Sequence, residues 1–186
     1  MRCVLISVPC FLSAAAAFGD DWPQFLGPTR NGVYLGVPLG SWKEGGPPVL
    51  WRKDIGRGFS GPVVAEGRLI LFHRLGDRET VECLEAGSGK KIWTFDYPTG
   101  YEDDFGFDDG PRATPAVSEG RVYTFGAEGA LHCLDLSSGA KLWSVDTQEK
   151  FRAQKGFFGL ASSPLIEGDR VLRIHVPPGL VHDRGS

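Results

Sequence analysis

The sequence predicts an all-β protein built from repeated units of four antiparallel strands. Three observations carry that prediction. The 186 residues include 26 glycines and 13 prolines, which punctuate short β-branched runs. After residue 19, no segment keeps apolar residues at i, i+3, i+4 and i+7 over three turns, which argues against a helical fold. The third observation is an internal repeat with a period near 50 residues.

The repeat appears in two families of segments. Residues 82–96 align without gaps to residues 132–146, at an offset of 50. Residues 62–72, 115–125 and 164–174 align at offsets of 53 and 49. Four short antiparallel strands at this period are typical of a β-propeller blade, so the chain predicts a partial propeller of about three blades. A β-sandwich would also space its strands regularly, but it gives no reason for the repeated tryptophan motif.

Each unit is expected to contain four strands in the same order. A glycine in the turn between the first two supplies the positive φ of a tight hairpin. The third strand surrounds Cys83 or Cys133, and the fourth surrounds Trp93 or Trp143. The first two are predicted at 62–65 and 68–73, at 115–118 and 121–125, and at 164–167 and 170–174.

The tryptophans are expected to join neighbouring blades. Trp93 and Trp143 each follow a glycine, Gly89 or Gly139, by four residues. On an outermost strand the indole can lie over the next blade, where a glycine offers backbone to stack on. Trp51 is predicted to hold the same position in a preceding blade whose earlier strands are missing, which suits a ring closed by a borrowed strand. The alternative is an aromatic platform for a ligand at the outer rim.

Charge and composition exclude some functions. The formal net charge is −3, and no lysine or arginine run exceeds two residues. A basic surface that binds nucleic acid is therefore not expected. With 41% hydrophobic and 23% charged residues, the chain has the composition of a folded protein. His73, His132, His175 and His182 lack the spacing of metal ligands.

Residues 1–19 are predicted to be a signal peptide. One charge, Arg2, precedes an apolar stretch and a run of alanines, with cleavage after Ala17 or Gly19. This predicts a periplasmic or secreted protein without an integral membrane segment after cleavage. A lipoprotein cysteine at Cys10 is the competing interpretation.

Cys83 and Cys133 remain after cleavage, and an oxidising compartment would permit a disulfide. They occupy the same position of consecutive units, which sheet packing separates by roughly 10 Å. Because that distance exceeds the reach of a disulfide, we expect both to be small buried apolar residues.

These motifs resemble a known family. The run from Leu134 to Trp143, its echo from Leu84 to Trp93, and the Gly-Pro or Ser-Pro at the start of inner strands are similar to the tryptophan-docking repeats of the pyrroloquinoline-quinone (PQQ)-like β-propellers. The opening, residues 21–32, resembles the start of exported bacterial PQQ-repeat proteins. The resemblance covers residues 20 to about 172 and implies the fold more strongly than an activity.

The resemblance implies two functions. Dehydrogenases of the family hold PQQ and calcium over the central channel, often beside a vicinal disulfide. This chain has no Cys-Cys pair, and no calcium-ligand set can be matched residue by residue. We therefore expect a binding or scaffold module with a protein or small-ligand partner at a propeller face, with no catalytic or metal-ligating residue assigned. The alternative is the N-terminal part of a PQQ-dependent dehydrogenase.

The candidate ligand residues lie where inner strands begin. Arg112 could orient an anionic group at the central funnel, or it could pair with the acidic loop before it, residues 97–112. Thr114 lies beside it, and the third unit offers Ser162 and Ser163. The five carboxylates of the loop do not follow calcium-loop spacing. We expect a solvated loop pinned by Tyr101, Phe105 and Phe107.

The last segment departs from the repeat. Residues 173–186 contain two adjacent prolines where the pattern predicts strands, so we interpret them as an atypical tail from a truncation or frameshift. About three blades are too few for a closed ring of four to eight. The chain is therefore expected to be an N-terminal fragment of a larger propeller, and a gene product without activity is a further alternative.

Overall fold

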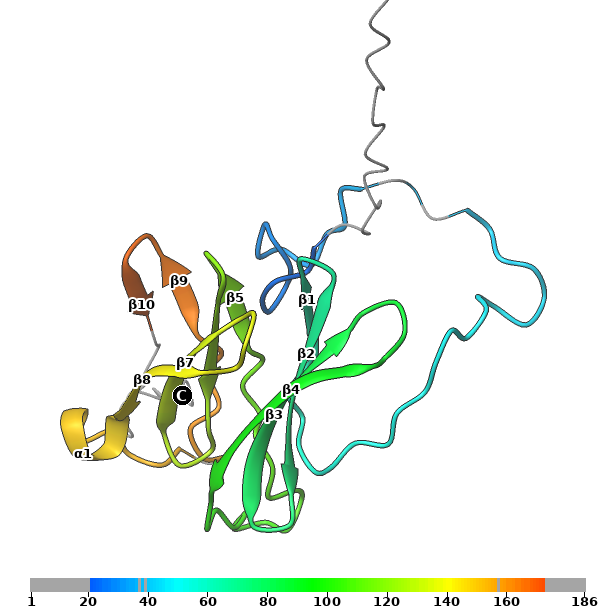
Figure 1. Cartoon of the computed structure of the whole chain (residues 1–186). Helices are drawn as coiled ribbons and strands as arrows, with labels where there is room; N and C mark the ends of the chain where they lie inside the picture. Colours follow the sequence, from blue (N-terminus) through cyan, green and yellow to red (C-terminus); the bar gives the residue numbers. More distant parts are fainter. Residues whose placement is uncertain (1–20, 37, 39, 157, 173–186) are drawn as a thin grey trace, which may run out of the picture.

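Two four-stranded antiparallel sheets and a two-stranded one form the body of the protein (Figure 1). The computed structural model describes residues 21–36, 38, 40–156 and 158–172. The predicted signal peptide and the tail at 173–186 lie outside the described residues.

Each sheet is one blade with its strands in chain order. The first contains β1 (Val63–Ala65), β2 (Arg68–Leu75), β3 (Arg78–Glu85) and β4 (Lys91–Pro98). The second contains β5 (Ala116–Ser118), β6 (Arg121–Phe125), β7 (Ala130–Asp135) and β8 (Lys141–Asp146). The third is described for β9 (Leu165–Glu167) and β10 (Arg170–Leu172). The partial propeller that the repeat predicts is confirmed.

The first two blades share a detailed irregularity. Cys83 pairs with Trp93 across β3 and β4, and Cys133 pairs with Trp143 across β7 and β8. In both blades the register shifts directly after the cysteine. The repeat therefore specifies local backbone geometry as well as strand order.

The main core lies between the first two blades. Val63, Ile70 and Phe72 of the first blade belong to one buried cluster with Val122 and Leu134 of the second. Cys83 and Cys133 are fully buried and unbridged, as expected of small apolar residues. Burial raises the pKa of the Cys83 thiol to about 11.

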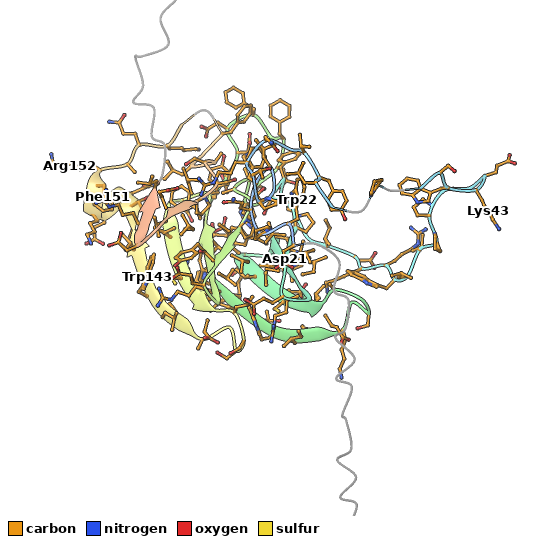
Figure 2. The ribbon with its side chains drawn as sticks, turned by 90° about the horizontal axis from the view of Figure 1, so that it is seen from above. Asp21, Trp22, Lys43, Trp143, Phe151 and Arg152 are labelled. Atoms are coloured by element: carbon orange, nitrogen blue, oxygen red, sulfur yellow. The ribbon has the colours of Figure 1, made fainter. Side chains whose placement is uncertain are left out.

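The N-terminal segment follows the inner side of the blades. Trp22 pairs with Val64 of β1 through two backbone hydrogen bonds of 2.8 and 3.0 Å, and the carbonyl of Pro23 accepts from the amide of Val117 in β5 at 2.7 Å. The chain then runs outward, and Lys43 lies at the far end of this excursion in Figure 2. Sequence reasoning did not predict either feature.

Two local features depart from the repeated strand pattern. The segment around Trp51 was expected to resemble an outer strand, yet residues 49–54 form no strand because no third strand lies beside them among the described residues. A short helix, α1 (Thr147–Phe151), follows β8 in a chain expected to be all-β. Asp146 starts it by accepting hydrogen bonds from the amides of Gln148 and Glu149 at 2.9 and 3.0 Å.

Antiparallel pairing gives the blades two different ends. The segments entering β1, β5 and β9, those leaving β4 and β8, and the β2–β3 and β6–β7 turns all lie at one end, which we call the loop face. The β1–β2, β3–β4, β5–β6, β7–β8 and β9–β10 turns lie at the other, the turn face. In the described part of the chain, no helix is long and apolar enough to cross a membrane.

Candidate functional site

The long segments of the loop face fit together through their backbones. The carbonyl of Pro111 accepts from the amides of Phe59 and Ser60 at 2.9 and 3.1 Å. A Cβ added at Gly110 would lie 2.3 Å from the carbonyl oxygen of Arg57, so only glycine permits this approach. The segment before β1 is thereby fixed against the segment before β5.

Arg112 lies at the centre of this contact and is largely buried. It forms an ion pair with Asp103, whose side chain is fully buried, and its Nη2 also donates to the carbonyl of Asp108 at 3.0 Å. Its guanidinium carbon lies 5.0 Å from the ring centroids of both Phe59 and Phe158. The ion pair with the acidic loop, which sequence reasoning left open, is therefore present.

The hydroxyls of Thr114 and Ser163, which the sequence offers as candidate ligand contacts, link neighbouring blades. Thr114 Oγ1 accepts from the amide of Gly61 at 3.3 Å, and Ser163 Oγ accepts from the amide of Thr114 at 2.9 Å. Gly61, Thr114 and Ser163 are equivalent positions of the three units, each directly before a proline. The same polar contact thus recurs from blade to blade. Ser162, next to it, is half-buried.

The predicted docking residues meet as expected for two of the three tryptophans. An added Cβ at Gly89 would lie 2.6 Å from the ring of Trp51, and one at Gly139 would lie 2.6 Å from the ring of Trp93. The indole nitrogens donate to the carbonyls of Ala86 and Leu136, at 2.9 Å in both cases. Each tryptophan therefore stacks on the glycine of the following blade.

Trp143 differs from the other two. Its side chain is 38% exposed, and its ring lies 6.0 Å from that of Tyr123 in its own blade. Figure 2 shows it at the outer side of the molecule, on the side of α1. Trp143 is thus equivalent to Trp51 and Trp93 in the sequence but has different surroundings in the structure.

The acidic loop is pinned in part only. Tyr101 is buried, as expected, whereas Phe105 and Phe107 are 51% and 66% exposed. Asp103 is buried rather than solvated because it pairs with Arg112. Phe105, Phe107 and Phe158 form a triangle with ring centroids 6.1 to 6.5 Å apart. The expectation that these phenylalanines anchor the loop is corrected, because they gather at the surface.

A buried polar contact at the blade junction was missed by sequence reasoning. Glu79 Oε1 accepts from the amide of Ala127 at 2.9 Å, and its Oε2 accepts from the Tyr97 hydroxyl at 2.5 Å. Burial raises the pKa of Glu79, and burial with the nearby Glu79 raises that of Tyr97. Glu79 has no counterpart at the aligned position of the next unit, Gly129, so the repeat gave no signal for it.

His132 packs against this junction. Its ring lies 4.3 Å from that of Tyr97 and 5.1 Å from that of Phe95, measured between centroids. Burial lowers the pKa of His132 to about 4, with a smaller contribution from Lys141. The imidazole is therefore neutral at physiological pH and acts as a packed ring.

The described residues contain no candidate calcium site. Among them, no group of three or more histidine, cysteine, aspartate or glutamate side chains could hold a metal ion. Arg112, the predicted anion contact, has Asp103 as its partner. We therefore derive no chemical step through this cofactor.

The fold and the stacked tryptophans define a propeller-repeat protein. Residues 77–181, more than half of the chain, match the family model described as outer membrane protein assembly factor BamB. The chain belongs to this family of PQQ-like propellers. The match extends past residue 172 into the segment that we interpret as a tail, and that interpretation stays a prediction.

Solved structures of similar fold include dehydrogenases and BamB. The quinohemoprotein alcohol dehydrogenase of Comamonas testosteroni is 26% identical over 63% of this chain and 17% of its own, with a TM-score of 0.45. The enzyme ADHIIG of Pseudomonas putida HK5 is 26% identical over 65% and 17%, with a TM-score of 0.47. BamB of Moraxella catarrhalis is 18% identical over 61% and 44%, with a TM-score of 0.35.

The chain thus spans less than a fifth of the two dehydrogenases and less than half of BamB. A search of curated proteins gives no match.

Proposed function

We propose that this chain is part of an exported scaffold module whose loop face binds a partner protein. One observation carries the proposal: aromatic side chains from three separate inter-blade segments are exposed together on that face. Phe59 precedes β1, Phe105 and Phe107 precede β5, and Phe158 precedes β9. Large apolar groups gathered at a surface are typical of protein interaction sites.

The family supports the same function. Its model carries the description of an assembly factor, and an assembly factor acts by contacting other proteins. In this proposal, residues 1–19 direct export and are removed, and residues 20–172 form the propeller part. Arg112 holds the exposed rings of Phe59 and Phe158 in place. Thr114, Ser162 and Ser163 belong to the blade junctions beneath.

Site-specific photocrosslinking in the native host tests the proposal with the full-length gene product. A photoreactive amino acid replaces Phe107 on the loop face, or Ser88 or Ser137 on the turn face. We expect a discrete crosslinked protein from position 107 and none from the other two. Equal crosslinking from all three positions, or none from position 107, would contradict the proposal.

A further inference from the structure

The two ends of the blades differ in the side chains that they expose. On the loop face, Ile55, Leu75 and the four phenylalanines Phe59, Phe105, Phe107 and Phe158 are 41% to 66% exposed. The turn face presents short turns such as Glu66-Gly67 and Glu119-Gly120. We define the phenylalanine patch as the four exposed rings of the loop face: Phe59, Phe105, Phe107 and Phe158.

The patch is rigidly supported from below. The guanidinium of Arg112 contacts the rings of Phe59 and Phe158, and Asp103 fixes that guanidinium. The amide of Phe105 donates to Asp103 Oδ1 at 2.8 Å, so the loop that carries the exposed rings is tied to the same carboxylate. A prearranged apolar surface loses little side-chain entropy when a partner binds.

The charges around the patch leave an excess of carboxylates. Arg57 pairs with Asp109 at 2.6 Å, and Lys155 pairs with Asp104 at 2.9 Å. The guanidinium of Arg74 donates to the backbone carbonyls of Gly76, Tyr101 and Asp109.

The acidic side chains at this end that have no ion pair within the described part of the chain include Glu102, Asp108 and Glu128. Glu102 and Glu128 are exposed. Glu102 and Asp108 belong to the same loop as Phe105 and Phe107, so negative charge without an ion pair lies on the loop that carries these exposed rings.

From this arrangement we propose that the phenylalanine patch binds an extended segment of a partner protein in which lysine or arginine alternates with apolar residues. The inference rests on the proposed function and names the chemistry of the partner. Apolar side chains of the segment cover the exposed rings. Its cations pair with Glu102 and Asp108 and stack on the exposed ring of Phe107. An acidic segment would meet uncompensated carboxylates.

Three synthetic peptides of equal length test the proposal with the intact chain. One alternates lysine with valine, one glutamate with valine, and one serine with valine. Binding is measured by fluorescence anisotropy at low and at high salt. We expect the lysine peptide to bind at least about fivefold more tightly than the serine peptide at low salt, and the glutamate peptide not to bind.

Matched variants locate the site. Phe107→Ser and Phe151→Ser make the same change at side chains that are 66% and 64% exposed, but only Phe107 belongs to the patch. We expect Phe107→Ser to weaken lysine-peptide binding about fivefold and Phe151→Ser to leave it unchanged. Glu102→Gln is expected to weaken the lysine peptide about twofold and leave the serine peptide unchanged, with Glu149→Gln on α1 as its control. Near-ultraviolet circular dichroism verifies that each variant is folded.

The contrary outcomes are distinct. If the serine or glutamate peptide binds as tightly as the lysine peptide, and Phe107→Ser weakens it, the basic partner is wrong while a protein-binding loop face stands. Peptide binding that Phe107→Ser leaves unchanged overturns the patch, as does the absence of binding by the lysine peptide. If sedimentation shows self-association that Phe107→Ser abolishes, the occupant is a second copy and the inference is overturned. The photocrosslinking above decides the proposed function separately.

Discussion

Trp93 and Trp143 occupy the same position of two consecutive blades, yet only one is buried. Each pairs across its sheet with a cysteine, beside the same shift in register. Trp93 is 8% exposed and stacks on Gly139 of the following blade, whereas Trp143 is 38% exposed. The difference teaches that the repeated tryptophan is stabilised by the next blade and only weakly by its own.

Replacing each of the two tryptophans with alanine should give the largest difference in the free energy of unfolding. Trp93→Ala removes a buried ring and its hydrogen bond to Leu136, so we expect a loss of about 3 to 5 kcal/mol in the free energy of unfolding. Trp143→Ala removes a half-exposed ring and should cost less than about 1 kcal/mol. Urea denaturation measures the loss of stability in both variants. Equal losses would contradict the conclusion that the following blade stabilises the tryptophan.

Substituting the glycine tests the same contact from the other side. Gly139 has a φ of 73°, and an added Cβ would meet the ring of Trp93. Gly120 has a φ of 68°, but an added Cβ there meets nothing within 4 Å. We expect Gly120→Ala to lower the free energy of unfolding by about 1 kcal/mol, from backbone strain alone. Gly139→Ala should lower it by about 3 kcal/mol, because the added Cβ also meets the ring of Trp93. Thermal or urea unfolding compares them, and equal costs would show that the indole does not rest on Gly139.

The blade junction should also respond to pH. The pKa of His132 falls from its ordinary 6.5 to about 4 on folding, so the unfolded chain binds this proton more readily. The stability that depends on a neutral His132 is present above pH 6.5 and is lost as the pH falls toward 4. His132→Phe keeps a ring against Tyr97 and should remove about 2 to 3 kcal/mol of that acid-induced loss. Urea denaturation at a series of pH values measures it, and parallel curves for variant and wild type would contradict the expectation.

A smaller loss of stability is expected from a substitution at the start of an inner strand. Thr114→Val removes the acceptor for the amide of Gly61, which should cost about 1 kcal/mol. Thr94→Val is the control, since Thr94 is exposed on β4. Chemical denaturation distinguishes the two. If Thr114→Val lowers the stability no more than Thr94→Val does, the hydrogen bond from Gly61 to Thr114 does not stabilise the fold.

The sequence predicted those parts of the fold that repeat. Strand order, the inner strands, the buried cysteines and the stacking of Trp51 and Trp93 followed from residues recurring near every 50 positions. Features outside the repeat were missed, including α1, the pairing of Trp22 with Val64, and the junction at Glu79. α1 begins at a local cap on Asp146, and the other two features depend on contacts between segments that share no periodic signal.

The candidate site was predictable only in part. Arg112 was singled out, and its pairing with the acidic loop was one of two alternatives considered. Its position between Phe59 and Phe158 could not be foreseen, because the three residues come from different inter-blade segments that meet only when the blades pack. The hydroxyls of Thr114 and Ser163 accept backbone amides, and their contact with a ligand stays a prediction.

Hydrogen exchange of the indole N–H groups, measured by nuclear magnetic resonance on the folded chain, tests the docking of tryptophans on neighbouring blades most directly. Trp51 and Trp93 donate to the carbonyls of Ala86 and Leu136, so their indole protons should exchange slowly. Trp143, which is 38% exposed, should exchange much faster. Equal protection of Trp93 and Trp143 would contradict the conclusion that the following blade buries the ring.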